Sequence, residues 1–211
     1  MIRLVVADDQ AILRQGLVAL LRLEGDLEVV GEAADGAGTL AAVAEHRPDV
    51  LLLDVQMPAG TTAEGGPGPE DGIAVARQLQ GADGAPRIIV LTTFGRAGYL
   101  RRTMEAGAQG FMVKDTPVEQ LVDAIRRVRQ GLRVVDPELA AQSLAVGPSP
   151  LTAKETEVLQ ATAAGGTTAR IAASLFLSEG TVRNHLSAVI GKLGVTNRAE
   201  AVRTASDNGW I

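Results

Sequence analysis

The sequence predicts two domains of different class: an α/β domain with a doubly wound, five-stranded parallel sheet, followed by an all-α domain of four helices. Within residues 1–131, apolar runs and segments of helical periodicity alternate five times, a pattern typical of a parallel sheet covered by helices on both faces. Residues 151–211 contain helical patterns only. Between them, residues 132–150 include Gly147-Pro148-Ser149-Pro150, a run that cannot form regular structure and therefore predicts a linker.

Short apolar runs mark the strands of the first domain, because strands buried on both faces of a sheet contain few polar residues. They span residues 2–7, 27–33, 50–53, 87–91 and 111–113. The helices follow in alternation, with apolar residues three and four positions apart. They span residues 11–23, 37–46, 73–79, 99–106 and 117–130. This alternation brings the carboxyl ends of all the strands to one edge of the sheet.

Composition excludes several classes of protein. The chain contains no cysteine, which rules out disulfides and cysteine-ligated metals. The first apolar run, residues 2–7, is too short for a signal peptide or a membrane span and ends at Asp8. No other apolar run approaches the length of a membrane span, so we expect a cytoplasmic protein with no membrane partner.

Polar residues follow four of the expected strands. Asp8 and Asp9 follow the first, Asp54 the third, Thr92 the fourth and Lys114 the fifth. Taken singly, each aspartate is as well explained as a turn or capping residue, and the threonine and the lysine as ordinary strand and surface residues. All five fall on the same edge of the predicted sheet, which favours a functional site.

The composition of this site predicts its chemistry. Three neighbouring carboxylates repel one another and require a cation. With no cysteine and no histidine nearby, a hard ion such as Mg²⁺ is the natural choice. A metal ion and a lysine can neutralise charge that develops on a phosphoryl group while a carboxylate acts as the nucleophile. The pattern therefore predicts a carboxylate that accepts a phosphoryl group.

Four motifs of this domain resemble those of receiver domains in two-component response regulators, which have the flavodoxin/CheY-like fold. They are Ala7-Asp8-Asp9, Leu53-Asp54-Val55-Gln56-Met57-Pro58, Leu91-Thr92-Thr93 and Phe111-Met112-Val113-Lys114-Asp115. The resemblance implies phosphorylation of Asp54 by a sensor histidine kinase in a phosphorelay. It also implies a phosphoacceptor, with at most slow self-catalysed phosphotransfer and dephosphorylation, and not an enzyme that turns over a substrate.

The resemblance also implies a role for each residue of the site. Mg²⁺ would be held by the side chains of Asp9 and Asp54 and the backbone carbonyl of Gln56, with Asp8 assisting through water. Lys114 would pair with the phosphoryl group. Thr92 would move toward that group, and Phe111 occupies the position of the switch aromatic of the family.

One segment departs from the family pattern. Twelve residues, Ala59 to Glu70, separate Pro58 from Asp71-Gly72, where the family usually has two. Their glycines and prolines predict a mobile surface loop. The loop could shield the pocket, contact the kinase or do neither, and the last is favoured because surface loops tolerate insertions.

In the second domain, helices are expected at residues 154–163, 168–175, 179–193 and 198–208. Thr152 and Glu155 predict a capping box at the start of the first. The third helix is amphipathic. Its apolar face contains Val182, Leu186, Val189, Ile190 and Leu193. Periodicity alone is also typical of a plain helical bundle with a solvated polar face.

The motifs of this domain resemble the LuxR/NarL-type helix-turn-helix, which places the chain in the NarL/FixJ family. They are Leu151-Thr152, Glu155, Glu157-Val158-Leu159, Ile171-Ala172, Leu177-Ser178, Gly180-Thr181-Val182-Arg183-Asn184-His185 and Lys192-Leu193-Gly194-Val195. By resemblance, the groups that face bases are Arg183, Asn184 and Ser187, and those that contact phosphates are Thr181, Lys192 and Arg198. His185 could contact phosphate or pack internally.

The implied partners are promoter DNA, the kinase and a second copy of the chain; RNA polymerase is a further candidate. Residues 151–211 have a net charge of only +1, so DNA contacts must be concentrated locally or multiplied by dimerisation. The resemblance places the phosphorylation-dependent dimer contact on residues 10–23 and 117–130. Residues 91–99 and Asn208-Gly209-Trp210 are similar to the DesR-like subgroup, which controls lipid desaturase genes.

Two other readings of the receiver motifs differ in class. A hydrolase that forms an aspartyl-phosphate would need a second aspartate two positions after Asp54, where this chain has Gln56. A transcription factor whose receiver serves only as a dimer platform is compatible with the insertion at Ala59. A receiver that is only a dimer platform would not accept a phosphoryl group from a kinase, whereas a regulated receiver would.

Overall fold

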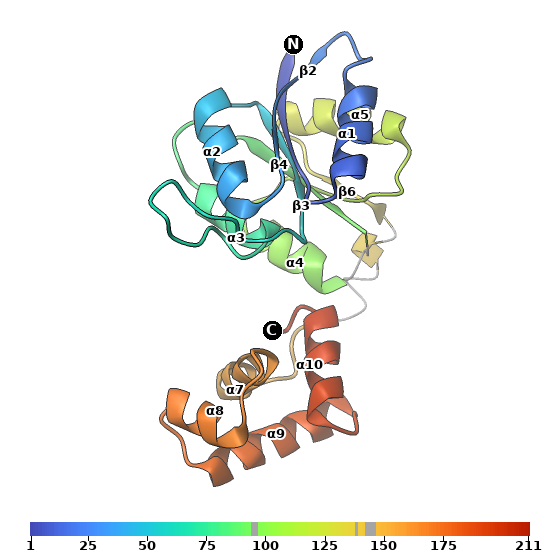
Figure 1. Ribbon diagram of the computed structural model, residues 1–211. Helices are drawn as coiled ribbons and strands as arrows, with labels where there is room; N and C mark the ends of the chain where they lie inside the picture. The colour runs from blue at the N-terminus through green and yellow to red at the C-terminus, as the bar shows by residue number, and fades with distance from the viewer. Residues whose placement is uncertain (94–96, 138, 142–146) are drawn as a thin grey trace. The chain divides into compact units, whose positions relative to one another are not determined.

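A computed structural model describes residues 1–93, 97–137, 139–141 and 147–211 (Figure 1). The chain divides into two compact units, Met1–Gly95 with Arg102–Ala140 and Arg96–Arg101 with Ala141–Ile211. The finer limits expected from the sequence, 1–131, 132–150 and 151–211, stay a prediction.

The first unit is built on a parallel sheet with strand order β2-β1-β3-β4-β5-β6. The strands are β1 Ile2–Ala7, β2 Leu27–Ala33, β3 Val50–Asp54, β4 Arg87–Thr92, β5 Gly110–Val113 and β6 Val134–Val135. All five expected strands are confirmed. The sheet has one strand more than predicted, because β6 pairs with β5 at the edge. This pairing involves two residues only, and β6 is too short to give a sequence pattern.

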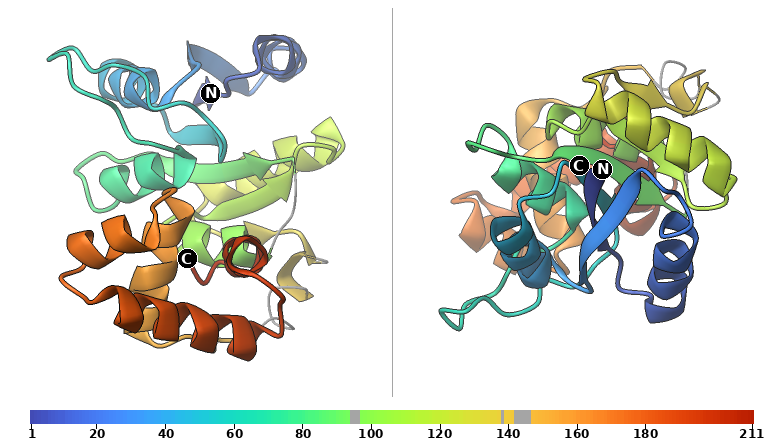
Figure 2. Two further views of the ribbon diagram at one scale, coloured as in Figure 1. Left: turned by 60° about the horizontal axis from the view of Figure 1, so that its bottom comes forward. Right: turned by 90° about the horizontal axis from the view of Figure 1, so that it is seen from above.

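Five helices accompany the sheet: α1 Ala11–Leu21, α2 Gly36–His46, α3 Gly72–Leu79, α4 Ala97–Glu105 and α5 Val118–Arg129. Figures 1 and 2 show α1 and α5 together on one face of the sheet, with α2 and α3 on the other. On the first face, Leu21 of α1 and Ile125 of α5 pack with Leu52 and Ile89 of the central strands, all fully buried. Asp35 and Asp71 cap α2 and α3 by accepting hydrogen bonds from the helices' backbone N–H groups.

The insertion at residues 59–70 has hydrogen bonds of its own. Thr61 and Pro67 form an antiparallel bridge, and the N–H of Thr62 donates to the carbonyl of Gly66 at 2.8 Å. The N–H of Gly68 donates to the carbonyl of Gly60 at 3.2 Å. The segment is therefore a small hairpin, and it extends beyond α2 (Figures 1 and 2). The sequence predicted a mobile surface loop, and the structure adds the hydrogen bonds across the segment, which the sequence pattern does not show. The mobility of the loop stays a prediction.

The base of this hairpin is joined to the start of α2. The N–H groups of Gly36 and Ala37 donate to the carbonyls of Pro58 and Ala59, each at 2.9 Å. The first N–H groups of a helix have no partner within it, so the carbonyls of Pro58 and Ala59, where the insertion begins, satisfy donors that would otherwise need water. The approach requires Gly68, because a Cβ there would lie 2.1 Å from the Ala59 carbonyl oxygen.

Within residues 147–211, all of which the structure describes, the chain forms the four predicted helices: α7 Ala153–Ala163, α8 Thr168–Ser174, α9 Glu179–Leu193 and α10 Arg198–Asp207. The capping box of Thr152 and Glu155 is present at the start of α7. The helices enclose one apolar core of buried residues. It contains Val158, Leu159, Ile171, Ala172, Val182, Leu186, Val189, Ala201 and Ala205. Among the described residues, no helix has both the length and the apolar character needed to cross a membrane.

Candidate functional site

Three carboxylates meet at the carboxyl edge of the sheet. Asp8 and Asp9 follow β1, and Asp54 is the last residue of β3. These strands are neighbours, with Ala7 opposite Leu53, so the residues that follow them lie side by side. Each aspartate offers a carboxylate oxygen, and these oxygens all lie within 4.8 Å of one another. The predicted cluster of Asp8, Asp9 and Asp54 is therefore present.

Lys114 lies between two of these carboxylates. Its ammonium nitrogen is 2.8 Å from Oδ2 of Asp8 and 2.8 Å from Oδ2 of Asp54. The side chains of these three residues are 8%, 4% and 3% exposed, respectively. The backbone N–H of Lys114 donates to the carbonyl of Thr92 at 2.8 Å, which fixes the start of this side chain beside β4. One buried cation thus joins β1, β3 and β5.

Burial controls the electrostatics of the pocket. It raises the pKa of Asp54, and the hydrogen bond and charge of Lys114 only partly oppose this effect. Burial opposes the charge of Lys114 as well, but its hydrogen bonds to Asp54 and Asp8 outweigh burial, and its pKa is raised. Lys114 contacts two of the three clustered carboxylates, and all three offer oxygen atoms as ligands. This donor set fits a hard divalent cation such as Mg²⁺.

The remaining predicted pocket residues surround Asp54. The backbone N–H of Gln56 donates to Oδ1 of Asp54 at 3.2 Å, so the Gln56 main chain lies against the acceptor carboxylate. Thr92, at the end of β4, is 3% exposed. Phe111 lies in β5, three residues before Lys114, and its ring is fully buried.

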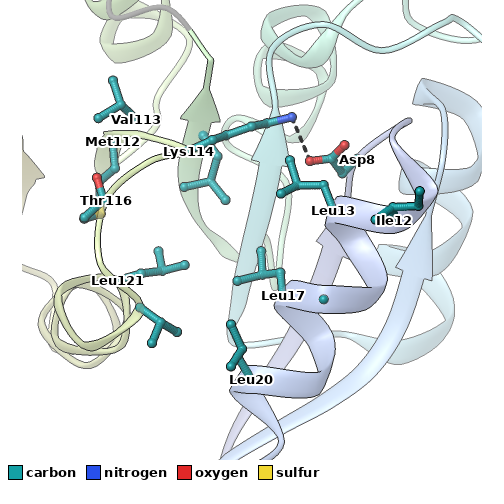
Figure 3. A pocket seen from close by; sticks show the side chains of 13 residues that line it. Asp8, Ile12, Leu13, Leu17, Leu20, Met112, Val113, Lys114, Thr116 and Leu121 are labelled. Atoms are coloured by element: carbon teal, nitrogen blue, oxygen red, sulfur yellow. Dashed lines mark ion pairs between the residues drawn. The ribbon is translucent and has the colours of Figure 1, made fainter.

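An apolar cavity of about 330 Å³ lies next to the pocket, between α1 and the chain leading into α5 (Figure 3). Its walls are mainly aliphatic side chains, with Asp8 and Lys114 at one end. The aliphatic residues include Ile12, Leu13, Leu17, Leu20, Val118 and Leu121. Three large apolar side chains of this wall are exposed to solvent: Ile12 is 89%, Leu20 is 46% and Leu13 is 38% exposed.

The resemblance to the family places a dimer contact on these helices, but no pattern in the sequence predicts the cavity. The periodicity of α1 indicates an apolar face but not how much of it the rest of the fold covers. Ile12 is apolar and lies outside the main apolar spacing of the helix. It is the signal in the sequence that points to this surface.

In the second unit, α9 separates buried apolar side chains from exposed polar ones. Val182, Leu186 and Val189 are buried, while Arg183, Asn184 and Ser187 are exposed. The helix begins at a cap in which Ser178 accepts a hydrogen bond from the N–H of Thr181. The remaining predicted contacts are the half-buried Thr181 and His185 and the exposed Lys192 and Arg198.

Lys192 has a partner that the sequence did not reveal. Its ammonium nitrogen is 2.6 Å from Oε2 of Glu155, whose side chain is 7% exposed. The same Glu155 oxygen accepts from the N–H of Thr152 at 2.7 Å. The hydrogen bond from Lys192 lowers the pKa of Glu155, and the N–H of Thr152 contributes. Lys192 thus joins α9 to the start of α7, a role that competes with the predicted phosphate contact.

Part of the motif that resembles the DesR-like subgroup, Phe94-Gly95-Arg96, lies outside the described residues. Both domains of the chain match known protein families. Residues 4–126 match the response regulator receiver domain family, and residues 149–205 match the luxR family of bacterial regulatory proteins.

The full chain is similar to two regulators of Bacillus subtilis (strain 168) over the whole length of both proteins. It is 41% identical to the uncharacterized transcriptional regulatory protein YvfU and 40% identical to the transcriptional regulatory protein DesR. Among solved structures, the RcsB–DNA complex of a two-component response regulator is 25% identical, with 98% of each chain covered and a TM-score of 0.68.

Both domains, their order and their joint extent thus agree with those of known transcriptional regulators. The chain belongs to the two-component response regulators of the NarL/FixJ family, in which a receiver domain is joined to a LuxR-type DNA-binding domain.

Proposed function

We propose that this response regulator is a cytoplasmic transcription factor activated when Asp54 accepts a phosphoryl group from a sensor histidine kinase. The receiver would comprise residues 1–131, the linker 132–150 and the DNA-binding domain 151–211. One observation carries the proposal: the Lys114 ammonium lies 2.8 Å from the carboxylates of both Asp8 and Asp54, beside a third carboxylate from Asp9.

Mg²⁺ would be held by the carboxylates of Asp9 and Asp54 and by the backbone carbonyl of Gln56, with Asp8 assisting through water. Its contribution, when bound, is to neutralise charge on the phosphoryl oxygens and to favour the ionised form of Asp54. Burial raises the pKa of Asp54 in the protein alone, so the nucleophile benefits from this second effect.

In the transfer step, a carboxylate oxygen of Asp54 attacks the phosphorus of a phosphohistidine. The new P–O bond forms as the P–N bond breaks, and the electron pair of that bond stays on the imidazole nitrogen. Lys114 exchanges its contact with Asp54 for one with the phosphoryl oxygens. Thr92 approaches the same oxygens, and Phe111 repacks with it.

The change at Lys114 reaches the surface through the apolar cavity, because Lys114 and Asp8 line its end. We propose that two phosphorylated receivers join through α1 and α5, covering Ile12 and the cavity. Two linked DNA-binding domains then engage neighbouring half-sites, and the effective concentration of the second domain raises affinity. Dimerisation offsets the small net charge of each DNA-binding domain.

On the DNA, Arg183, Asn184 and Ser187 would face bases in the major groove, since their side chains are exposed on α9. Thr181 and Arg198 would contact phosphates. Lys192 can contact a phosphate only if its ammonium group binds Glu155 and the phosphate together or breaks its ion pair with Glu155. His185 is half-buried and is compatible with either packing or a phosphate contact.

Labelling with acetyl phosphate in Mg²⁺ tests the proposal, with Asp54→Asn as the variant and Asp83→Asn, at an exposed surface position, as its matched control. Wild type and the control should gain one phosphoryl group by mass spectrometry, then dimerise and bind DNA more tightly. Asp54→Asn should do neither. Activation of Asp54→Asn to the same extent as the control would refute the assignment.

A further inference from the structure

The turn between α8 and α9 presents an unusually exposed aromatic side chain. Phe176 is 96% exposed, the largest exposed fraction among the exposed large hydrophobic residues of the described chain. Its neighbours Leu175 and Leu177 are both partly buried against the core of the unit. The turn is held by backbone hydrogen bonds, including that from the N–H of Leu177 to the carbonyl of Ala172 at 2.9 Å. The ring of Phe176 therefore contributes little to packing.

The backbone of Phe176 is also in an unfavourable conformation. Its φ is +55°, and only one other described non-glycine residue, Arg47, has a positive φ. A Cβ makes this left-handed region costly, whereas glycine adopts it readily. Turns of this motif often contain glycine. Phenylalanine at this position thus adds backbone strain without burying its ring. Residues with such strain are typical of functional sites, so we infer a functional role for the side chain.

Phe176 lies just before α9 in the chain, and this position indicates which kind of partner its ring would contact. It lies two residues before Ser178, the cap from which α9 begins. A recognition helix enters the major groove with its N-terminal residues closest to the bases. In that geometry the turn before the helix, which contains Phe176, would lie close to the DNA strand that borders the groove.

We propose that Phe176 makes an apolar contact with duplex DNA at the edge of the groove that α9 enters. The inference rests on the proposed function. The chemistry recognised is the hydrocarbon surface of DNA, either the C5-methyl group of a thymine or the carbons of a deoxyribose. Such a contact adds affinity without charge, which suits a domain whose net charge is only +1.

The test compares Phe176→Gly, which removes the ring and relieves the positive φ, with Phe176→Tyr, which keeps the ring. The probe is a duplex selected from a random library by the full-length wild-type chain in the presence of beryllofluoride. Phe176→Gly should bind this duplex roughly tenfold more weakly, whereas Phe176→Tyr should bind it like wild type. Unfolding followed by Trp210 fluorescence should show that Phe176→Gly is as stable as wild type or more stable.

Salt dependence separates this contact from an ionic one. The slope of log Kd against log salt should be unchanged in Phe176→Gly, because no phosphate contact is lost, and should decrease in a variant that loses a phosphate contact, such as Arg198→Ala. Replacement of thymine by uracil in the duplex identifies the contacted group. If uracil weakens wild type but not Phe176→Gly, the ring contacts a methyl group; if uracil affects neither, the ring contacts deoxyribose.

Unchanged affinity of Phe176→Gly overturns the proposal, including the case in which only transcription falls and the ring contacts a protein. Loss of stability together with affinity overturns it as well, because the ring is then structural. If Phe176→Gly does not fold, Phe176→Asn, which also tolerates the left-handed conformation, replaces it. Failure of activated wild type to select any duplex would instead count against the proposed function.

Discussion

Replacement of Lys192 by methionine tests the ion pair that joins α9 to α7. The substitution keeps most of the aliphatic stem and removes the charge that faces Glu155 at 2.6 Å. Removing one partner of a fully buried pair costs about 3–5 kcal/mol. The side chain of Lys192 is 37% exposed, so solvent screens the interaction, and we expect a loss of about 1–2 kcal/mol.

This loss is large for a small domain. The unfolding free energy of about sixty residues is about 3–9 kcal/mol, and a change of 1–2 kcal/mol lowers the Tm by about 5–15 °C. Trp210 is the only tryptophan of the chain and packs against the core of the second unit, so its fluorescence reports the unfolding of this unit. Urea unfolding at neutral pH measures the change.

The matched control is Lys154→Met. Lys154 is 2.7 Å from Glu157, but both side chains of this pair are exposed, at 40% and 48%. An exposed pair contributes about 0–1 kcal/mol. Equal destabilisation by both variants would refute the argument that burial of Glu155 makes the Lys192 pair important.

The same pair predicts a pH dependence. Folding lowers the pKa of Glu155, chiefly through the hydrogen bond from Lys192. The stabilisation is therefore fully present above the pKa of unfolded glutamate, about 4.3, and is lost as the pH falls through the lower pKa of the folded state. In Lys192→Met, the free energy of unfolding should decrease less than in wild type as the pH falls through this range. A plot of unfolding free energy against pH that runs parallel to that of wild type would contradict the assignment.

Three further predictions concern the receiver. Ile12→Glu should weaken phosphorylation-dependent dimerisation at least about tenfold in analytical ultracentrifugation, because it places a charge in the apolar part of the α1–α5 contact; normal dimerisation would contradict the proposed surface. Lys114→Met should slow labelling of Asp54 by acetyl phosphate about 100-fold or more, since the buried ammonium beside the acceptor is lost; an unchanged labelling rate would show that Lys114 has no part in transfer. Gly68→Ala should destabilise the receiver by about 1–3 kcal/mol in urea unfolding, because the new Cβ meets the Ala59 carbonyl, whereas Gly66→Ala, where the nearest atom is 3.6 Å away, should be neutral; equal effects would refute the packing of the hairpin base.

The acidic pocket was predictable because the carboxyl ends of parallel strands all lie at one edge of the sheet, so residues that end different strands come together. Asp8 and Asp54 are far apart in sequence, but each ends a strand, and the strands are neighbours. The double contact of Lys114 was not predictable in the same way, since it depends on side-chain conformations. The sequence predicted a lysine near the site, and the structure shows which oxygens it contacts.

Contacts between distant segments account for what the sequence did not predict. The hairpin at residues 59–70 has a composition typical of loops, and its base accepts hydrogen bonds from the N–H groups of Gly36 and Ala37 in another element. Lys192 was correctly placed near the end of α9, but its partner Glu155 belongs to α7. Periodicity reports the face of a helix and carries no information on its partners.

The most direct measurement of the central claim is the position and the Mg²⁺ dependence of the acyl phosphate. The full chain is treated with acetyl phosphate, with Mg²⁺ or with EDTA, and the modified residue is identified by peptide mass spectrometry. We predict a single phosphoryl group, on Asp54, that forms with Mg²⁺ and fails to form in EDTA. Modification at another residue, or equal modification of Asp54 without a divalent ion, would contradict the account.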